Sequence, residues 1–393
     1  MSAAAAPKPA MHYGRLISEP LLGALAAGGP LHSVMAWRQE DLVLRDVQLR
    51  HEPKGPASWV SLYLGLTSIL DIVERAGEFR LRAHPTHRAR GQFGDSWDSW
   101  QSLGVLTQRW PKVQDYLSRI VHEVDHRWLD SEGKVHALLA ASANTGFSVI
   151  NREASISFSN QPTKKKLVDG WTKAVGQALD TGDTSPWLTA LRAKKLGTSP
   201  DFLAVDDAGR LLVIEAKPAT AAAGIVGAPA QVGLYAAMYA AWLDQVGDAG
   251  TAELTAELVQ RRRLGLVPGL AERFLAARPQ VVPVLAIGPG VVSPEVWERV
   301  RSVAQALSSS ALSQGVAPLE VLRLTVDGTP TPVDLQAAAL SQPAVTSDDL
   351  AISSYSQRAR SAAVAWKLGL EPPEARADGA YGGTGVRYPF CLP

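Results

Sequence analysis

The clearest hydrophobic pattern in the chain covers residues 199–217. Phe202–Val205 form one short apolar run, a polar turn occupies residues 206–210, and Leu211–Ile214 form a second apolar run. Two apolar runs joined by a turn rich in Asp and Gly are typical of a β-hairpin. The pattern therefore predicts two antiparallel strands within a buried sheet.

Charged residues stand at the open end of this predicted hairpin. If the strands pair symmetrically about Ala208, Asp201 lies directly opposite Glu215, with Cβ atoms about 5 Å apart. Side chains alternate along a strand, so Lys217 shares a face with Glu215 while Ala216 points the other way. Two carboxylates in this position repel each other, and a divalent cation is the simplest partner that makes the cluster favourable.

Hydrophobic periodicity outside the hairpin predicts alternating helices and strands. Around the hairpin it predicts, in chain order, a helical region over 113–143, a strand over 147–158, helices over 167–179 and after Pro229, a strand over 281–287, a helix over 294–307 and a strand over 319–324. We interpret this order as helix, three strands, helix, strand. Such alternation is typical of an α/β fold.

The same pattern divides the chain into four segments. We expect a disordered tail over 1–12, a mixed α/β accessory or recognition region over 13–112, a core over 113–327 and a C-terminal extension over 328–393. A charged insertion interrupts the core near residues 248–279.

Composition narrows the class of protein only slightly. The 39 Lys and Arg residues nearly balance the 38 Asp and Glu residues, so any nucleic-acid surface has to be a local patch. Cys391 is the only cysteine, which excludes an internal disulfide framework and a multi-cysteine zinc or iron–sulfur site. A reducing cytoplasm is the expected location.

One uncharged stretch, Pro218–Leu243, has to be considered as a membrane span. Gly224, Gly227 and Pro229 interrupt it, and Gln231 adds a polar side chain. We therefore predict a loop followed by a buried helix, and no membrane partner.

The pair Pro200-Asp201, followed after a spacer by Glu215-Ala216-Lys217, resembles the signature of the PD-(D/E)xK nuclease superfamily. The resemblance covers residues 130–326, where the predicted order of elements is that of the superfamily's core. It implies an α/β fold with a restriction-endonuclease-like core, in which helices flank a central mixed sheet in αβββαβ order. The N-terminal region would then be an additional mixed α/β part.

The resemblance also implies roles for the residues at the end of the hairpin. Asp201, Glu215 and the backbone carbonyl of Ala216 would bind Mg²⁺, with Mn²⁺ able to substitute. The metal would lower the pKa of a water and neutralise charge on the scissile phosphate. Lys217 would position or polarise the attacking water and stabilise the transition state.

Supporting residues are expected on two helices. Gln231 and Tyr235 share one helix face and resemble the QxxxY element of RecB-like nucleases, which supports the metal site and the substrate backbone. The alternative is that Tyr235 only lines the buried face. The superfamily also places an acidic residue before the first strand; we expect Glu132 there, with Glu153 as the alternative. A solvated Glu132 at a helix start explains that residue equally well.

Three basic runs are candidates for phosphate contacts. They are Lys164, Lys165 and Lys166; Lys194 and Lys195; and Arg261, Arg262 and Arg263. A charge run is more often solvated surface, so each run has that alternative interpretation.

A competing motif lies at residues 122–126, where His122, Glu123 and His126 match HExxH. On a helix the two histidines can share a zinc ion, with the glutamate as base of a metallopeptidase. Asp125 puts a charge at a position where zincins resemble one another in having uncharged residues, which weakens this interpretation. Two ordinary histidines on a surface helix are the simplest one.

The sequence thus favours a metal-dependent nuclease that hydrolyses phosphodiester bonds in DNA, with restriction or genome defence as the role that analogy suggests. A zinc metallopeptidase and a catalytically inactive nucleic-acid-binding module are the alternatives. DNA is the expected partner, and the choice between a homodimer and a partner subunit stays open.

Overall fold

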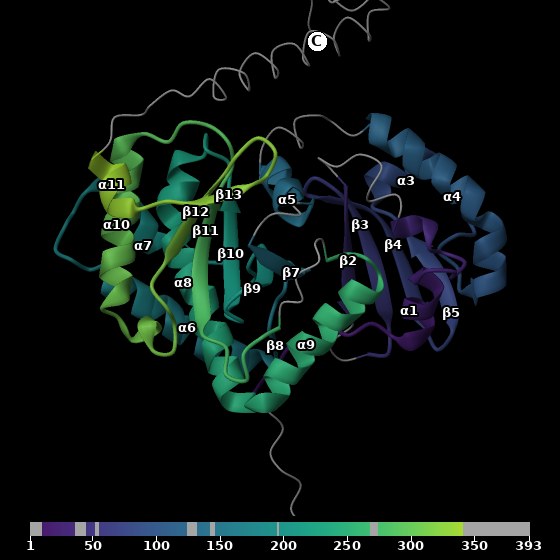
Figure 1. The fold of residues 1–393 in the computed structure, drawn as a ribbon, viewed down its shortest axis with the longest axis horizontal. Coiled ribbons are helices and arrows are strands. Elements are labelled where there is room, and N and C mark those ends of the chain that lie inside the picture. The colour runs from purple at the N-terminus through teal and green to yellow at the C-terminus, as the bar shows by residue number, and fades with distance from the viewer. Residues whose placement is uncertain are drawn as a thin grey trace, which may run out of the picture. The chain divides into compact units, whose positions relative to one another are not determined.

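The computed structural model describes residues 10–35, 45–51, 55–123, 132–141, 146–194, 196–267 and 274–340. All of them belong to one structural unit, Met1–Ala344, whereas a second unit, Val345–Pro393, lies outside the described residues. The described part is an α/β structure in which helices flank a mixed sheet and an antiparallel sheet (Figure 1).

The mixed sheet contains six strands in the order β13-β12-β11-β10-β9-β7. These strands are β7 (Phe147–Arg152), β9 (Phe202–Asp206), β10 (Leu211–Lys217), β11 (Val281–Ile287), β12 (Glu320–Leu324) and β13 (Pro330–Pro332). β7, β9 and β10 pair antiparallel, β10, β11 and β12 pair parallel, and β13 pairs antiparallel with β12. The centre of the sheet is buried on both faces, as the unbroken apolar run in β11 requires.

The hairpin of β9 and β10 has the predicted register. Leu211 pairs with Val205 and Ile214 pairs with Phe202, so the pairing is symmetric about Ala208. The turn is held by Asp206, whose side chain accepts hydrogen bonds from two backbone N–H groups of the turn at 3.0 and 2.9 Å. Gly209 has a φ of 74°, a conformation that glycine adopts without steric cost.

Helices cover both faces of the mixed sheet. α5 (Glu132–Ala141) packs on the face that carries Phe202, Leu212 and Ile214. The opposite face is covered by α6 (Gln161–Ala178), α7 (Pro186–Ala193), α8 (Ala222–Val246) and α10 (Pro294–Ser308). Because side chains alternate along β9 and β10, each strand contributes to both hydrophobic layers.

The N-terminal region forms a separate antiparallel sheet in the order β2-β3-β4-β5-β6. Its strands are β2 (Arg45–His51), β3 (Ser58–Leu64), β4 (Thr67–Arg75), β5 (Glu78–Arg82) and β6 (Gln101–Ser102), and its helices are α1 (Glu19–Leu25), α3 (Pro85–Gly91) and α4 (Leu103–Glu123). The expected boundary between 112 and 113 is wrong, because it falls inside α4. Trp110 and Val113 pack in the same hydrophobic cluster on either side of that boundary.

Two other expected boundaries also shift. Met11–His12 form β1, which pairs with β8 (Ser157–Phe158), so the tail predicted over 1–12 is ordered at its end. The sheet continues past residue 327 through β13, with α11 (Leu335–Leu340) after it. In the described stretches no helix combines the length and the hydropathy that crossing a bilayer requires.

The charged insertion is the helix α9 (Asp248–Arg263), which joins the two sheets. Leu254 and Leu258 belong to the cluster around α8, while Leu264 and Leu266, just after the helix, belong to the N-terminal cluster. Arg261 is buried and its guanidinium donates to the Gln48 side chain at 3.2 Å.

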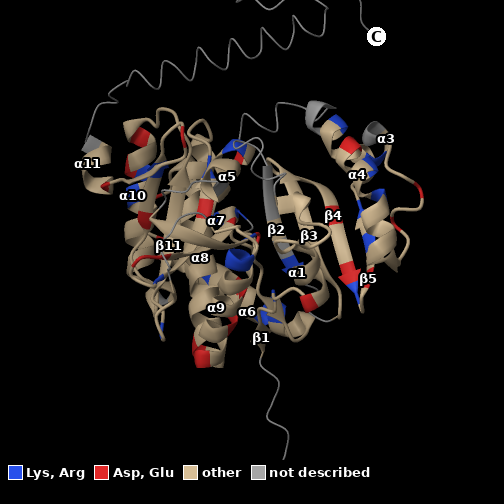
Figure 2. Ribbon diagram, turned by 45° about the vertical axis from the view of Figure 1, so that its right-hand side comes forward, with Lys and Arg blue, Asp and Glu red and all other residues tan. Residues whose placement is uncertain are grey.

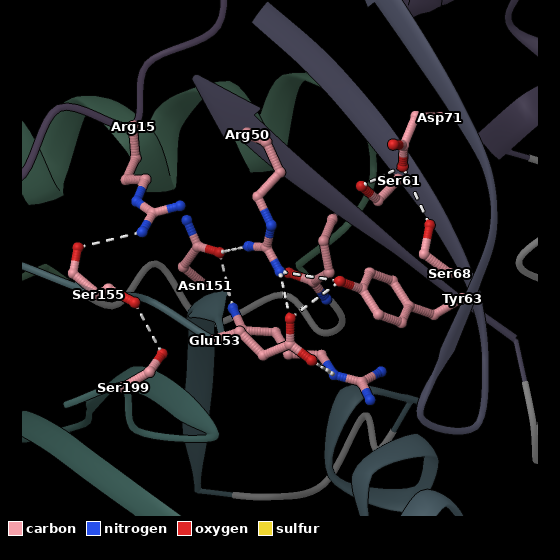
Figure 3. A network of polar contacts seen from close by, with 12 residues as sticks. Arg15, Arg50, Ser61, Tyr63, Ser68, Asp71, Asn151, Glu153, Ser155 and Ser199 are labelled. Atoms are coloured by element: carbon pink, nitrogen blue, oxygen red, sulfur yellow. Dashed lines mark hydrogen bonds and ion pairs between the residues drawn. The ribbon is translucent and has the colours of Figure 1, made fainter. Parts of the chain in front are cut away.

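A buried polar network connects α9 to both sheets. Glu257 accepts hydrogen bonds from the Tyr13 hydroxyl at 2.9 Å and from the Asn151 amide. Asn151 in turn accepts from Arg50 of β2, and Arg50 lies beside Tyr63 and Glu153 (Figure 3). Burial raises the pKa of Glu257 to about 7, although Tyr13, nearby arginines and Asn151 partly offset that rise.

We expect Glu257→Gln to make stability less dependent on pH. The folded protein binds the Glu257 proton more tightly than the unfolded chain does, since the pKa is about 7 when folded and 4.5 otherwise. Wild-type stability is therefore lost as pH rises through this window, by about 1.4 kcal/mol per pH unit relative to the variant. Urea unfolding between about pH 5 and 8 measures this difference. The exposed Glu298→Gln variant serves as the control, and parallel curves for wild type and Glu257→Gln would contradict the expectation.

Candidate metal centre

Three charged side chains meet at the open end of the β9–β10 hairpin. Asp201 directly precedes β9, and its Oδ2 accepts the backbone N–H of Ala216 at 2.8 Å. Lys217 Nζ lies 2.8 Å from Glu215 Oε1 and 4.0 Å from Asp201 Oδ2. Ala216 points to the opposite face and is fully buried there. The structure thus brings together the three residues that the hairpin pattern placed side by side.

Helix α5 adds two further residues to the cluster. Glu132, at its first position, forms an ion pair with Lys217. His136 follows one turn later, and its Nε2 lies 3.5 Å from Asp201 Oδ2. The His136 ring also packs edge-on against Phe202, with ring centroids 5.1 Å apart. Sequence reasoning missed His136, although its spacing of four from Glu132 on a predicted helix was a usable signal.

The expected alternative to Glu132 lies elsewhere. Glu153 accepts a hydrogen bond from the Tyr63 hydroxyl at 3.0 Å and lies 3.7 Å from Arg50, so its side chain is engaged by the N-terminal sheet (Figure 3). Its backbone N–H, however, donates to the carbonyl oxygen of Asp201 at 2.9 Å. Glu132 is therefore the acidic residue whose side chain joins the cluster.

Glu132, His136 and Asp201 form a candidate metal-ligand set. Each offers one ligand atom, and these atoms lie within 4.8 Å of one another. His136 is only 2% exposed. Its Nε2 lies 3.5 Å from Asp201 Oδ2, which is too long for a well-formed hydrogen bond, and its Nδ1 has no hydrogen-bond partner among the described residues. Poorly satisfied buried polar atoms are costly, and a metal ion would supply a closer partner. The residues present therefore fit a divalent cation.

The charged groups of the cluster shift one another's pKa values. Burial would raise the pKa of Asp201, but the His136 ring, the Lys217 ammonium and the Ala216 N–H together hold it below its ordinary value. Burial and the Asp201 charge raise the pKa of Glu215 to about 8, against the opposing effect of Lys217. Burial lowers the pKa of Lys217, but Glu215 and Asp201 more than compensate and raise it. The cluster thus contains a stable ammonium and at least one carboxylate that stays ionised.

No protein-family model, no curated protein and no solved structure matches the chain.

Gln231 and Tyr235 of α8 lie beside the cluster. Lys194 Nζ donates to Gln231 Oε1 at 3.4 Å. Tyr235 is 2% exposed, and its pKa is raised by burial and then by the negative charges of Glu215 and Asp201. Tyr235 thus lies on the buried face, close enough to the site for Glu215 and Asp201 to shift its pKa, and its role in supporting a metal site stays a prediction.

The other predicted basic residues differ in their surroundings. Arg261 is buried against Gln48, so its assignment as a phosphate contact is wrong. Arg262 stacks over the Phe274 ring at 4.6 Å, and Arg263 pairs with Glu19 at 3.2 Å. In the view of Figure 2, basic and acidic residues are interspersed along the helices.

The two lysine runs are exposed to different degrees. Lys164, Lys165 and Lys166 lie in the first turns of α6, half-buried to exposed, and Lys165 pairs with Asp169. Lys194 is exposed near Gln231, and Lys195 lies outside the described residues.

The HExxH motif lies largely outside the described residues. The backbones of His122 and Glu123 end α4, but their side chains and the whole of His126 are not described. The zinc interpretation therefore stays a prediction.

We expect Mg²⁺ or Mn²⁺ to stabilise the metal-free wild-type protein and to have no such effect on Asp201→Asn. An ion that binds only the folded state at 100 times its Kd adds about 2.7 kcal/mol to the free energy of unfolding. Thermal unfolding with added ion, and again with EDTA, measures the change. Asp244→Asn, exposed on α8, is the matched control and should respond like wild type. Equal stabilisation of Asp201→Asn would place the ion elsewhere.

Proposed function

We propose that the protein is a metal-dependent nuclease that hydrolyses phosphodiester bonds, with DNA as substrate. The observation that carries the proposal is the meeting of Asp201, Glu215 and Lys217 with Glu132 and His136 at the end of a central hairpin. Carboxylates, an imidazole and an ammonium in one place suit a divalent cation beside a phosphate.

The order of elements supports a restriction-endonuclease-like core. α5, β7, β9, β10, α8 and β11 follow one another in αβββαβ order, with α6, α7, α9 and β8 as additions. β7, β9 and β10 form an antiparallel meander, and β11 joins β10 in parallel. DNA as the substrate and a role in restriction or genome defence rest on the resemblance of motifs.

Each residue of the cluster has a role that follows from its chemistry. Glu132, His136 and Asp201 would hold the ion, with Glu215 and the Ala216 carbonyl as the further ligands that the resemblance implies. A bound divalent cation supplies acidification of a water and charge neutralisation at the phosphate. Lys217 places an ammonium where negative charge grows on the phosphoryl oxygens, and a point charge of this kind suits phosphate. Glu215 and Glu132 hold Lys217 in position from two sides.

His136 changes the expectation about the metal. Mg²⁺ prefers oxygen ligands, whereas imidazole nitrogen is a better ligand for transition metals. A set of two carboxylates and one imidazole therefore suits Mn²⁺ at least as well as Mg²⁺.

The proposal predicts metal-dependent cleavage of DNA, tested on supercoiled plasmid and on single- and double-stranded oligonucleotides, that Lys217→Ala lowers by about 100-fold or more, the loss typical for one electrostatic group in an active site. Agarose-gel assays with Mg²⁺, Mn²⁺ or EDTA measure the rate. Lys112→Ala, an exposed lysine of α4, is the matched control. Cleavage that survives EDTA or Lys217→Ala would contradict the proposal, as would a wild-type protein that cuts neither plasmid nor single- or double-stranded oligonucleotides.

A further inference from the structure

A cavity of about 700 Å³ lies near the candidate metal centre and is lined by residues of α7, the first turns of α8 and α10. Figure 1 shows these three helices on one side of the mixed sheet. The volume of the cavity is that of a pocket for a small organic ligand. Small residues dominate the wall, namely Ala190, Ala193, Ala222, Ala223, Gly224 and Gly227. They leave room where larger side chains would fill the space between the helices.

The cavity adjoins the cluster through two of its lining residues. Gly224 lies against Lys217, since a Cβ at this glycine would come within 3.2 Å of the Lys217 side chain. Lys194 lines the cavity and reaches Gln231, the neighbour of the cluster on α8. Gly224 therefore separates a ligand in the cavity from the Lys217 side chain.

The larger side chains that line the cavity are one aromatic ring, two cations and three aliphatic residues, namely Trp187, Lys194, Arg299, Leu191, Val226 and Val296. Trp187 is half-buried, and the Arg299 guanidinium lies 5.4 Å from the centre of its ring. Arg299 also pairs with the exposed Glu295, so only part of its charge is available. Lys194 is exposed, and among the described residues no carboxylate lies within ion-pair distance of it.

We propose that this cavity binds an unpaired nucleotide of the strand that is cut. The base stacks against Trp187, and the flanking phosphates lie toward Lys194 and Arg299. Aromatic rings and positive side chains are the usual means by which proteins hold single strands without reading their sequence. A base inside a duplex is covered by its stacked neighbours and cannot present its face to Trp187. The choice of ligand rests on the proposed nuclease function and names single-stranded ends or gaps as its substrate class.

Cations alone would not distinguish a single strand from a duplex, because both carry phosphates. The apolar wall adds an interaction that only an unpaired base can use. The proposal therefore predicts a preference that depends on the base and not only on the charge.

The test measures binding of the full chain, in EDTA, to three labelled 12-mers by fluorescence anisotropy. They are a single strand, the blunt duplex of the same sequence, and a single strand of abasic residues. We expect the single strand to bind at least about fivefold tighter than the abasic strand, the lower limit for loss of one base–aromatic stack.

Two variants address the cavity itself. Trp187→Leu removes the stacking surface, and Ala190→Trp fills the cavity from an exposed position of α7. Each should weaken binding of the single strand at least about fivefold and leave duplex binding unchanged. Trp187 packs on the core, so Trp187→Leu will lower the thermal midpoint somewhat, and binding is compared well below it. Thr189→Trp, the exposed neighbour outside the cavity, is the matched control and should bind like wild type.

The outcomes separate this inference from the nuclease proposal. Wild-type binding that does not depend on bases, or that Ala190→Trp leaves unchanged, overturns the inference even if the protein cuts DNA. The inference is also overturned if none of the three 12-mers binds. If Ala190→Trp weakens binding of the single strand but the wild-type protein cuts no DNA, the cavity binds a single strand and the nuclease proposal is wrong.

Discussion

The charged cluster of Asp201, Glu215 and Lys217 depends on the register of one hairpin. The Asp206 turn aligns β9 with β10 so that Glu215 and Lys217 face the side where Asp201 arrives. A slip of one residue would turn every side chain of a strand to the other face. Glu215 would then enter the hydrophobic layer that Ala216 fills, and the cluster would not exist.

With this register, the negative charges of the cluster outnumber the positive charge of its one lysine. Glu132, Asp201 and Glu215 surround one ammonium, that of Lys217, in a largely buried position. Lys217 has three N–H donors and can contact all three carboxylates, but its single charge leaves a surplus. His136 adds a ring nitrogen at the same place, which can serve as a metal ligand. A bound cation would offset this surplus of negative charge, whereas a structural ion-pair network alone would leave it uncompensated.

Features that depend on neighbouring residues in the sequence could be predicted, and features that depend on distant segments could not. The hairpin register followed from the turn and the two apolar runs, whereas the boundary at residue 112 failed because helical periodicity in α4 has no break there. Arg261 shows a different failure, since three consecutive arginines look alike in sequence. It lies four residues after Glu257 and three after Leu258, on the buried stripe of α9, and that spacing was the available signal. The cavity beside α7 depends on helices distant in sequence, which no local pattern relates.

The N-terminal sheet contacts the cluster indirectly, through Glu153. Glu153 has a φ of 51°, which is unfavourable for a residue with a side chain, and its N–H holds the Asp201 carbonyl. Tyr63 and Arg50 of the N-terminal sheet bind the Glu153 side chain and so favour this conformation (Figure 3). A strained residue persists where its surroundings determine it. The position of Asp201 thus depends on contacts more than 130 residues earlier in the chain, by the numbering of the residues involved. The N-terminal sheet therefore helps to hold Asp201 in position through Glu153.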